Sequence, residues 1–167
     1  MNSLQKVQKI SKILYVLTMI AFVCSIVGLV SSIIGSIFVG VHGLDASIIN
    51  YFVSIGVPLD PNMALCACIC SAVECLFLLI LYVFVKKFYK QELQLGNPFD
   101  KPVVKSMRKL GILHIILPIV ASLIIAIIVA CFGVEDINIQ NWSNITLGIV
   151  YLIVSYILEY GSELKRR

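Results

Sequence analysis

Long runs of apolar residues, separated by short polar segments, dominate the chain. No Asp, Glu, Lys or Arg occurs between Lys12 and Asp45, and the run over 63–85 is interrupted only by Glu74. Two further runs follow in the last third of the sequence. About 20 helical residues cross the ~30 Å hydrocarbon core of a bilayer. The pattern therefore predicts four transmembrane helices, at 14–40, 63–85, 111–133 and 143–159.

Composition supports the same fold class. Hydrophobic residues make up 60% of the 167 residues and charged residues 13%, whereas soluble domains have about 45–50% and about 25%. A soluble core of this size could not bury so much apolar surface. We therefore expect an all-α integral membrane bundle, forming a single transmembrane domain over 1–167.

The basic residues predict how the chain is oriented. All 13 Lys and Arg fall before the first span, between the second and third, or after the fourth. By the positive-inside rule, both termini and the central loop are cytoplasmic, an N-in/C-in topology. The first apolar run is too long for the core of a cleavable signal peptide and is interpreted as a permanent helix. Residues 4–14 either lie in the headgroup plane or form the first turns of that helix.

The connecting segments carry their own signals. The apolar residues between the first two spans predict an interfacial helix, and Asp60 followed by Pro61 predicts the start of the second helix. In the central loop, helix should stop at 96–98 and restart at Asp100.

The restarted segment is amphipathic. Val103, Met107 and Leu110 share one helix face, which predicts a basic cytoplasmic helix on the inner membrane surface. Two roles remain open: a topology signal that also binds anionic lipid, and a docking surface for a cytoplasmic partner. The basic residues that would serve either role are Lys101, Lys105, Arg108 and Lys109.

A stripe of small residues runs along the first span. Its members recur every four residues: Gly28, Ser32, Ser36 and Gly40. Such stripes let helix backbones approach closely in lipid. We expect a packing seam, within one chain or between two.

Cysteines are concentrated in the second span, at Cys66, Cys68, Cys70 and Cys75. They form no C-x-x-C pair and have no nearby histidine, so metal ligation has little support and small-residue packing is favoured. A disulfide between Cys66 and Cys131 stays open, because sequence does not supply its geometry.

Glu74 lies at the middle of the second span, where an ionised carboxylate costs ~3 kcal/mol. We therefore expect it to face the bundle interior. Matching depth by helical rise places Ser25, Ser122 and Tyr151 in its layer and His114 about 10 Å nearer the cytoplasm. Glu74 is then either a neutral acid hydrogen-bonded to a hydroxyl, or a group that binds a proton or cation.

Sequence motifs for hydrolytic or nucleotide chemistry are not found. We therefore expect no enzymatic activity, no cofactor, no metal and no direct binding of nucleic acid.

Two segments carry a resemblance to a known family: Gly96-Asn97-Pro98-Phe99 with the basic stretch up to Gly111, and 160–164, which reads Tyr-Gly-Ser-Glu-Leu. Over essentially its whole length the chain resembles an uncharacterised bacterial four-helix membrane family, domain-of-unknown-function family 2975. The resemblance implies an inner-membrane protein, often encoded beside a small helix-turn-helix DNA-binding protein. This chain has Lys165-Arg166-Arg167 where many relatives continue into an acidic tail.

The leading hypothesis is a regulatory protein of the bacterial cytoplasmic membrane. Its cytoplasmic face, 96–108 with 163–167, would bind a small soluble DNA-binding regulator. The alternative is a small proton-coupled transporter or channel subunit centred on Glu74, in a homo-oligomer. A third possibility is an accessory subunit of a larger complex.

Overall fold

The computed structural model describes residues 3–43, 45, 60–96, 99–134 and 142–164. These residues form four helices: α1 (Ser3–His42), α3 (Pro61–Leu95), α4 (Lys101–Phe132) and α5 (Trp142–Leu164). Each is long and apolar enough to cross a membrane. The predicted all-α fold with four such helices is confirmed. The predicted interfacial helix before Asp60 falls outside the described residues.

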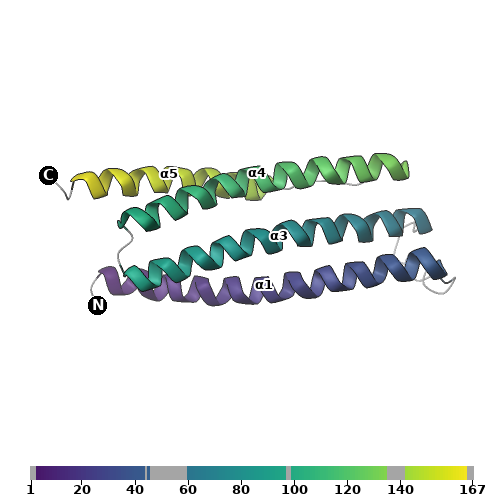
Figure 1. Ribbon diagram of the computed structural model, residues 1–167, viewed down its shortest axis with the longest axis horizontal. Helices are drawn as coiled ribbons and strands as arrows, with labels where there is room; N and C mark the ends of the chain where they lie inside the picture. Colours follow the sequence, from purple (N-terminus) through teal and green to yellow (C-terminus); the bar gives the residue numbers. More distant parts are fainter. Residues whose placement is uncertain (1–2, 44, 46–59, 97–98, 135–141, 165–167) are drawn as a thin grey trace.

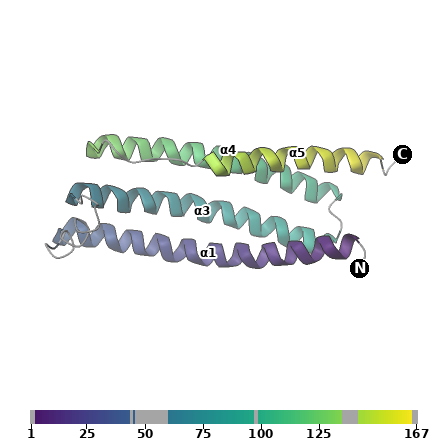
Figure 2. The ribbon, with the colours of Figure 1, turned by 180° about the vertical axis from the view of Figure 1, so that it is seen from behind.

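The helices run up and down, so that both ends of the chain and the α3–α4 connection lie at one end of the molecule (Figures 1 and 2). Here α1 packs against α3, α3 against α4, and α4 against α5. Within the described ranges, the backbones of α1 and α5 do not approach one another. The four helices therefore form an open arrangement in which α3 is flanked by α1 and α4.

Local sequence explains where the helices begin and end. Gly96 follows α3 in the left-handed region, with φ 67°, and its N–H bonds the Glu92 carbonyl. Glycine adopts this conformation without steric cost, which ends the helix. Asp60 and Asp100 precede α3 and α4 in extended conformation, and a proline occupies the first turn of each helix. The predicted end of the helix at Gly96, the predicted restart at Asp100 and the predicted start at Asp60 and Pro61 are thus found.

The first turns of α1 belong to one continuous helix, which decides between the two alternatives for residues 4–14. Gln8 Nε2 donates to the Gly96 carbonyl at 3.4 Å, and Ser11 Oγ donates to Glu92 Oε1 at 2.9 Å. Glu92 lies seven residues beyond the predicted span 63–85. Burial raises the pKa of its carboxyl, and the hydrogen bond from Ser11 opposes that shift. These contacts fix the start of α1 against the end of α3.

The larger part of the core lies at the same end of the molecule. Val103 and Leu110 are each 1% exposed and pack with Phe88 and Tyr89 of α3. The apolar face of 101–110, which the sequence assigned to the membrane surface, is therefore covered by protein. The reason is that α3 continues ten residues past the predicted span and meets the first turns of α4.

Two glycines set the contact between α4 and α5. A Cβ at Gly111 would lie 3.0 Å from the Gly148 carbonyl oxygen, and a Cβ at Gly148 would lie 2.9 Å from the Gly111 carbonyl oxygen. Trp142, the first residue of α5, precedes Gly148 by six residues, about 9 Å of helix. Because α4 and α5 run in opposite directions, the residue of α4 at the level of Trp142 lies six residues after Gly111, at Leu117. Thus α5 begins near the middle of α4 (Figure 1).

Candidate functional site

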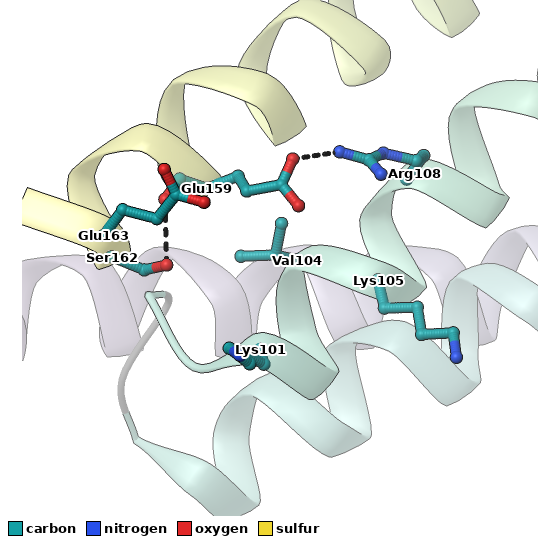
Figure 3. A pocket seen from close by; sticks show the side chains of 7 residues that line it. All are labelled: Lys101, Val104, Lys105, Arg108, Glu159, Ser162 and Glu163. Carbon is teal, nitrogen blue, oxygen red and sulfur yellow. Dashed lines mark hydrogen bonds and ion pairs between the residues drawn. The ribbon is translucent and has the colours of Figure 1, made fainter. Parts of the chain in front are cut away.

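A hollow lies between the first turns of α4 and the last turns of α5. We call it the α4–α5 groove. Its volume is about 370 Å³, within the range of ligand-binding pockets. Figure 3 shows the side chains that line it: Lys101, Val104, Lys105, Arg108, Glu159, Ser162 and Glu163.

The two walls of the groove have opposite charge. The α4 wall is basic and the α5 wall is acidic. Arg108 and Glu159 join the walls by a hydrogen-bonded ion pair. The Arg108 guanidinium also lies over the Tyr156 ring, with Cζ 4.6 Å from the ring centroid, a favourable cation–π position. Ser162 Oγ donates to the Glu159 carbonyl at 2.8 Å, at the end of α5.

Other charges of the groove are available to a ligand. Lys101, Lys105 and Glu163 form no ion pair with any residue in the described ranges. Lys105 and Glu163 are exposed, and Figure 3 shows the Lys105 ammonium turned away from the α5 carboxylates. Beside the pair of Arg108 and Glu159, the groove therefore presents groups of both signs that no other described residue pairs.

The segments that carry the family resemblance meet beside this groove. Phe99 lies against Gly161, where a Cβ would be 3.2 Å from Phe99 Cε1. The glycine lets the ring approach the α5 backbone. Phe99, just before α4, and Gly161 of α5 thus bring these two parts of the sequence into contact.

The four basic residues predicted as a binding set differ in their surroundings. Lys101 and Lys105 line the groove, Arg108 is engaged by Glu159, and Lys109 is exposed outside the groove lining. Arg108 thus holds α4 and α5 together as well as lining the groove. Sequence analysis did not single out Glu159 as its partner, because this pairing depends on how α5 is placed along α4.

Glu74 lies on an exposed face of α3, although the sequence predicted an interior position. Among the described helices, only α1 and α4 have backbones close to that of α3. A cavity of about 20 Å³ adjoins Glu74 and is lined by neighbours that include Leu117, Pro118 and Ala121 of α4. Such a space holds about one water molecule. It does not hold a larger solute.

Some of the residues that were predicted to lie at the same depth as Glu74 lie at another depth. The Tyr151 ring lies 5.1 Å from the His114 ring, centroid to centroid, and His114 Nδ1 is 2.9 Å from the Leu110 carbonyl oxygen. His114 precedes Ala121 by seven residues, about 10 Å of helix. Tyr151 therefore belongs to the layer of His114. Depth matching assumed that each helix is centred in the bilayer, whereas α5 is displaced along α4.

Ser122 and Ser25 are the two serines that were predicted to lie at the same depth as Glu74. Ser122 is half-buried and follows Ala121, which lines the cavity beside Glu74. Ser25 is buried on α1, and its hydroxyl donates to the Ala21 carbonyl at 3.0 Å.

The small residues of α1 lie along its contact with α3. A Cβ at Gly28 would be 3.0 Å from Cys75 Sγ, and Ser32 Oγ donates to Ser71 Oγ at 3.0 Å. Ser36 Oγ instead donates to the Ser32 carbonyl at 2.8 Å, and Gly40 has Leu65 at 3.9 Å. The structure places this stripe at a contact within one chain.

The cysteines are free thiols in the structure. Cys68 and Cys75 pack against glycines of α1, while Cys66 and Cys70 are buried with Sγ atoms 4.0 Å apart. Over the described ranges, no group of three His, Cys, Asp or Glu side chains is arranged to hold a metal ion.

Comparison of the chain with protein-family models, with curated proteins and with solved structures finds no match. The resemblance to domain-of-unknown-function family 2975 therefore stays a prediction from the sequence.

Proposed function

We propose that this chain is a non-enzymatic, multi-pass protein of the bacterial cytoplasmic membrane that binds a small soluble protein at the α4–α5 groove. The single observation that carries the proposal is that the groove joins two segments distant in sequence into one surface, where charges of both signs form no ion pair with another described residue. Electrostatic complementarity of that kind gives specificity to a partner with the opposite pattern. A partner helix with acidic and basic side chains on one face would fit both walls.

The side of the membrane and the nature of the partner rest on further arguments. The positive-inside rule places this end of the molecule in the cytoplasm. The family resemblance implies that a small helix-turn-helix regulator is encoded nearby, and we propose such a regulator as the partner. The lipid bilayer surrounds the apolar helices. The protein itself makes no contact with nucleic acid.

Co-purification tests the proposal. The tagged protein is isolated from its native membrane in mild detergent, and bound proteins are identified by mass spectrometry. We expect a small soluble protein whose recovery falls at least about tenfold when Lys101 and Lys105 are both changed to Glu. Arg108 is left unchanged, because its loss would also remove its ion pair with Glu159 of α5.

A matched control reverses the same charge outside the groove. Lys87→Glu with Lys90→Glu alters two exposed lysines near the end of α3 and should leave recovery unchanged. Equal recovery with the groove variant and the wild type would reject the groove as the binding surface. Equal loss in both variants would show that only overall charge matters.

No observation favours transport as a second function. The cavity of about 20 Å³ beside Glu74 holds no solute larger than water.

A further inference from the structure

Two thiols lie side by side near the end of the molecule that is opposite the groove. Cys66 and Cys70 are one helical turn apart on α3, and their Sγ atoms are 4.0 Å from one another. Cys66 is 0% exposed and Cys70 is 6% exposed. Pro61, the first residue of α3, precedes Cys66 by five residues, about 8 Å of helix. The pair is therefore buried close to the start of α3 (Figure 1).

Apolar side chains surround the two thiols. Ile125 of α4 is buried in the same cluster, and partly buried residues pack against it: Val73, Ile128, Val129, Phe132 and Val134. None of these side chains carries an oxygen or nitrogen atom. Over the described ranges, no third His, Cys, Asp or Glu is placed to share a metal ion with the pair. The described residues thus offer two sulfur atoms in an apolar pocket.

This arrangement suits a soft metal ion that accepts few ligands. A bond between a thiolate sulfur and a metal is about 2.3 Å long, so one ion can contact both sulfur atoms without moving the helix. Zinc takes four ligands in structural sites, and Ca²⁺ and Mg²⁺ take oxygen ligands. Cu(I) prefers sulfur, and two sulfur ligands are enough to hold it.

We propose that Cys66 and Cys70 form a binding site for Cu(I). The ion bonds to both Sγ atoms, and one of the two thiols releases its proton to solvent. Because a monovalent ion replaces a proton, the site carries no net charge before or after binding. The large cost of burying a net charge in apolar surroundings is therefore avoided. No electron is transferred in this exchange.

The other thiols of the chain do not share this arrangement. Cys68 and Cys75 pack against glycines of α1, and Cys24 and Cys131 are exposed. The sequence favoured packing for the cysteines of α3, because it lacks a C-x-x-C pair. Whether two sulfur atoms four residues apart meet depends on their rotamers, which sequence does not specify. The site is independent of the α4–α5 groove, and either proposal can fail alone.

A Cu(I) titration of the full chain tests the proposal. Cys24→Ser and Cys131→Ser first remove the exposed thiols. The reduced protein, in mild detergent and without oxygen, then competes for Cu(I) with a coloured chelator. We expect one Cu(I) per chain, with sulfur ligands in its X-ray absorption spectrum. Loss of an outer-shell partner already weakens metal binding by about 10–100-fold, so adding Cys66→Ser or Cys70→Ser should weaken binding at least as much.

The matched control removes two other thiols of the same helix. Cys68→Ser with Cys75→Ser, added to the same background, should bind Cu(I) unchanged. Thermal unfolding without copper shows whether each variant is folded, and Cu(I) should raise the midpoint only where both Cys66 and Cys70 are present. Three results would each overturn the proposal: a chelator that keeps all the Cu(I), unchanged binding in both Cys66→Ser and Cys70→Ser, or equal loss of binding in the control.

Discussion

Arg108 has two roles that the sequence did not separate. It was predicted as one of four binding residues, yet its guanidinium pairs with Glu159 and lies over Tyr156. The two charged side chains are 35% and 45% exposed. Solvent therefore screens the pair, and its contribution is at the scale of surface ion pairs.

A double-mutant cycle measures this pair. Arg108→Gln and Glu159→Gln should each destabilise the protein, with a coupling energy of roughly 0.5–1 kcal/mol. Unfolding in detergent, followed by helicity, provides the values. Lys105→Gln is the control, and it should be additive with Glu159→Gln because Lys105 forms no ion pair in the described ranges. Zero coupling for Arg108, or equal coupling for Lys105, would contradict the geometry.

For individual residues, the sequence indicated which side chains could have a role, but not which other side chains they contact. It predicted that the basic residues of 101–109 and the acid Glu74 are functional, and these roles stay predictions. It did not predict the pairing of Arg108 or the exposed position of Glu74, because both depend on how whole helices are placed. A side chain's surroundings in a membrane protein follow from its neighbours, which depth along one helix does not specify.

Among the described helices, the backbone of α5 approaches only that of α4. Gly111 and Gly148 are the glycines at which the two backbones come close together. The stripe on α1 was predicted from its repeat, whereas these two glycines were missed because each is isolated in its own helix. Gly111 opens the predicted third span and Gly148 lies in the fourth, and only the fold shows that they face one another.

Gly148→Ala tests the importance of this contact. Its Cβ would lie 2.7 Å from Ile115 Cγ1 and 2.9 Å from the Gly111 carbonyl oxygen. We expect a loss of about 1–3 kcal/mol in stability, as for other overpacked cores, with α5 displaced from α4.

Gly40→Ala is the matched control. Its nearest neighbour is Leu65 Cδ1 at 3.9 Å, so the methyl group fits. Glycine costs about 0.5–1 kcal/mol relative to alanine within a helix, and this variant should be neutral or slightly more stable. Thermal unfolding of both variants in the same detergent gives the comparison. Equal stability of Gly148→Ala and Gly40→Ala would show that α4 and α5 can move apart without a loss of stability.

For the molecule as a whole, four helices and the turn at 96–100 could be predicted from hydrophobic runs, charges and the glycine and prolines of 96–102. The open arrangement could not, because apolar helices show the same hydropathy whether they face lipid or protein. The displacement of α5 along α4 could not be predicted from the sequence for the same reason. It decides which residues line the groove and which face of α3 stays uncovered.

The N-in/C-in topology is a prediction for the whole molecule. Fluorescent protein fused to residue 167 should fluoresce, and alkaline phosphatase fused there should be inactive, because fluorescence requires a cytoplasmic location and phosphatase activity an external one. Alkaline phosphatase fused at Asp60, in the outer connection between the first two spans, should be active. Active phosphatase at the C-terminus would place the groove outside and contradict its proposed role.

Site-specific photo-crosslinking in living cells tests whether the α4–α5 groove binds a soluble partner. A photoreactive amino acid replaces Lys105 in the groove, or Lys87 on α3 as the control, and crosslinked products are identified by mass spectrometry. The proposed function predicts one small soluble protein crosslinked at 105 and absent at 87. Crosslinks at 105 only to lipid or to this chain, or the same products at both positions, would contradict a partner-binding groove.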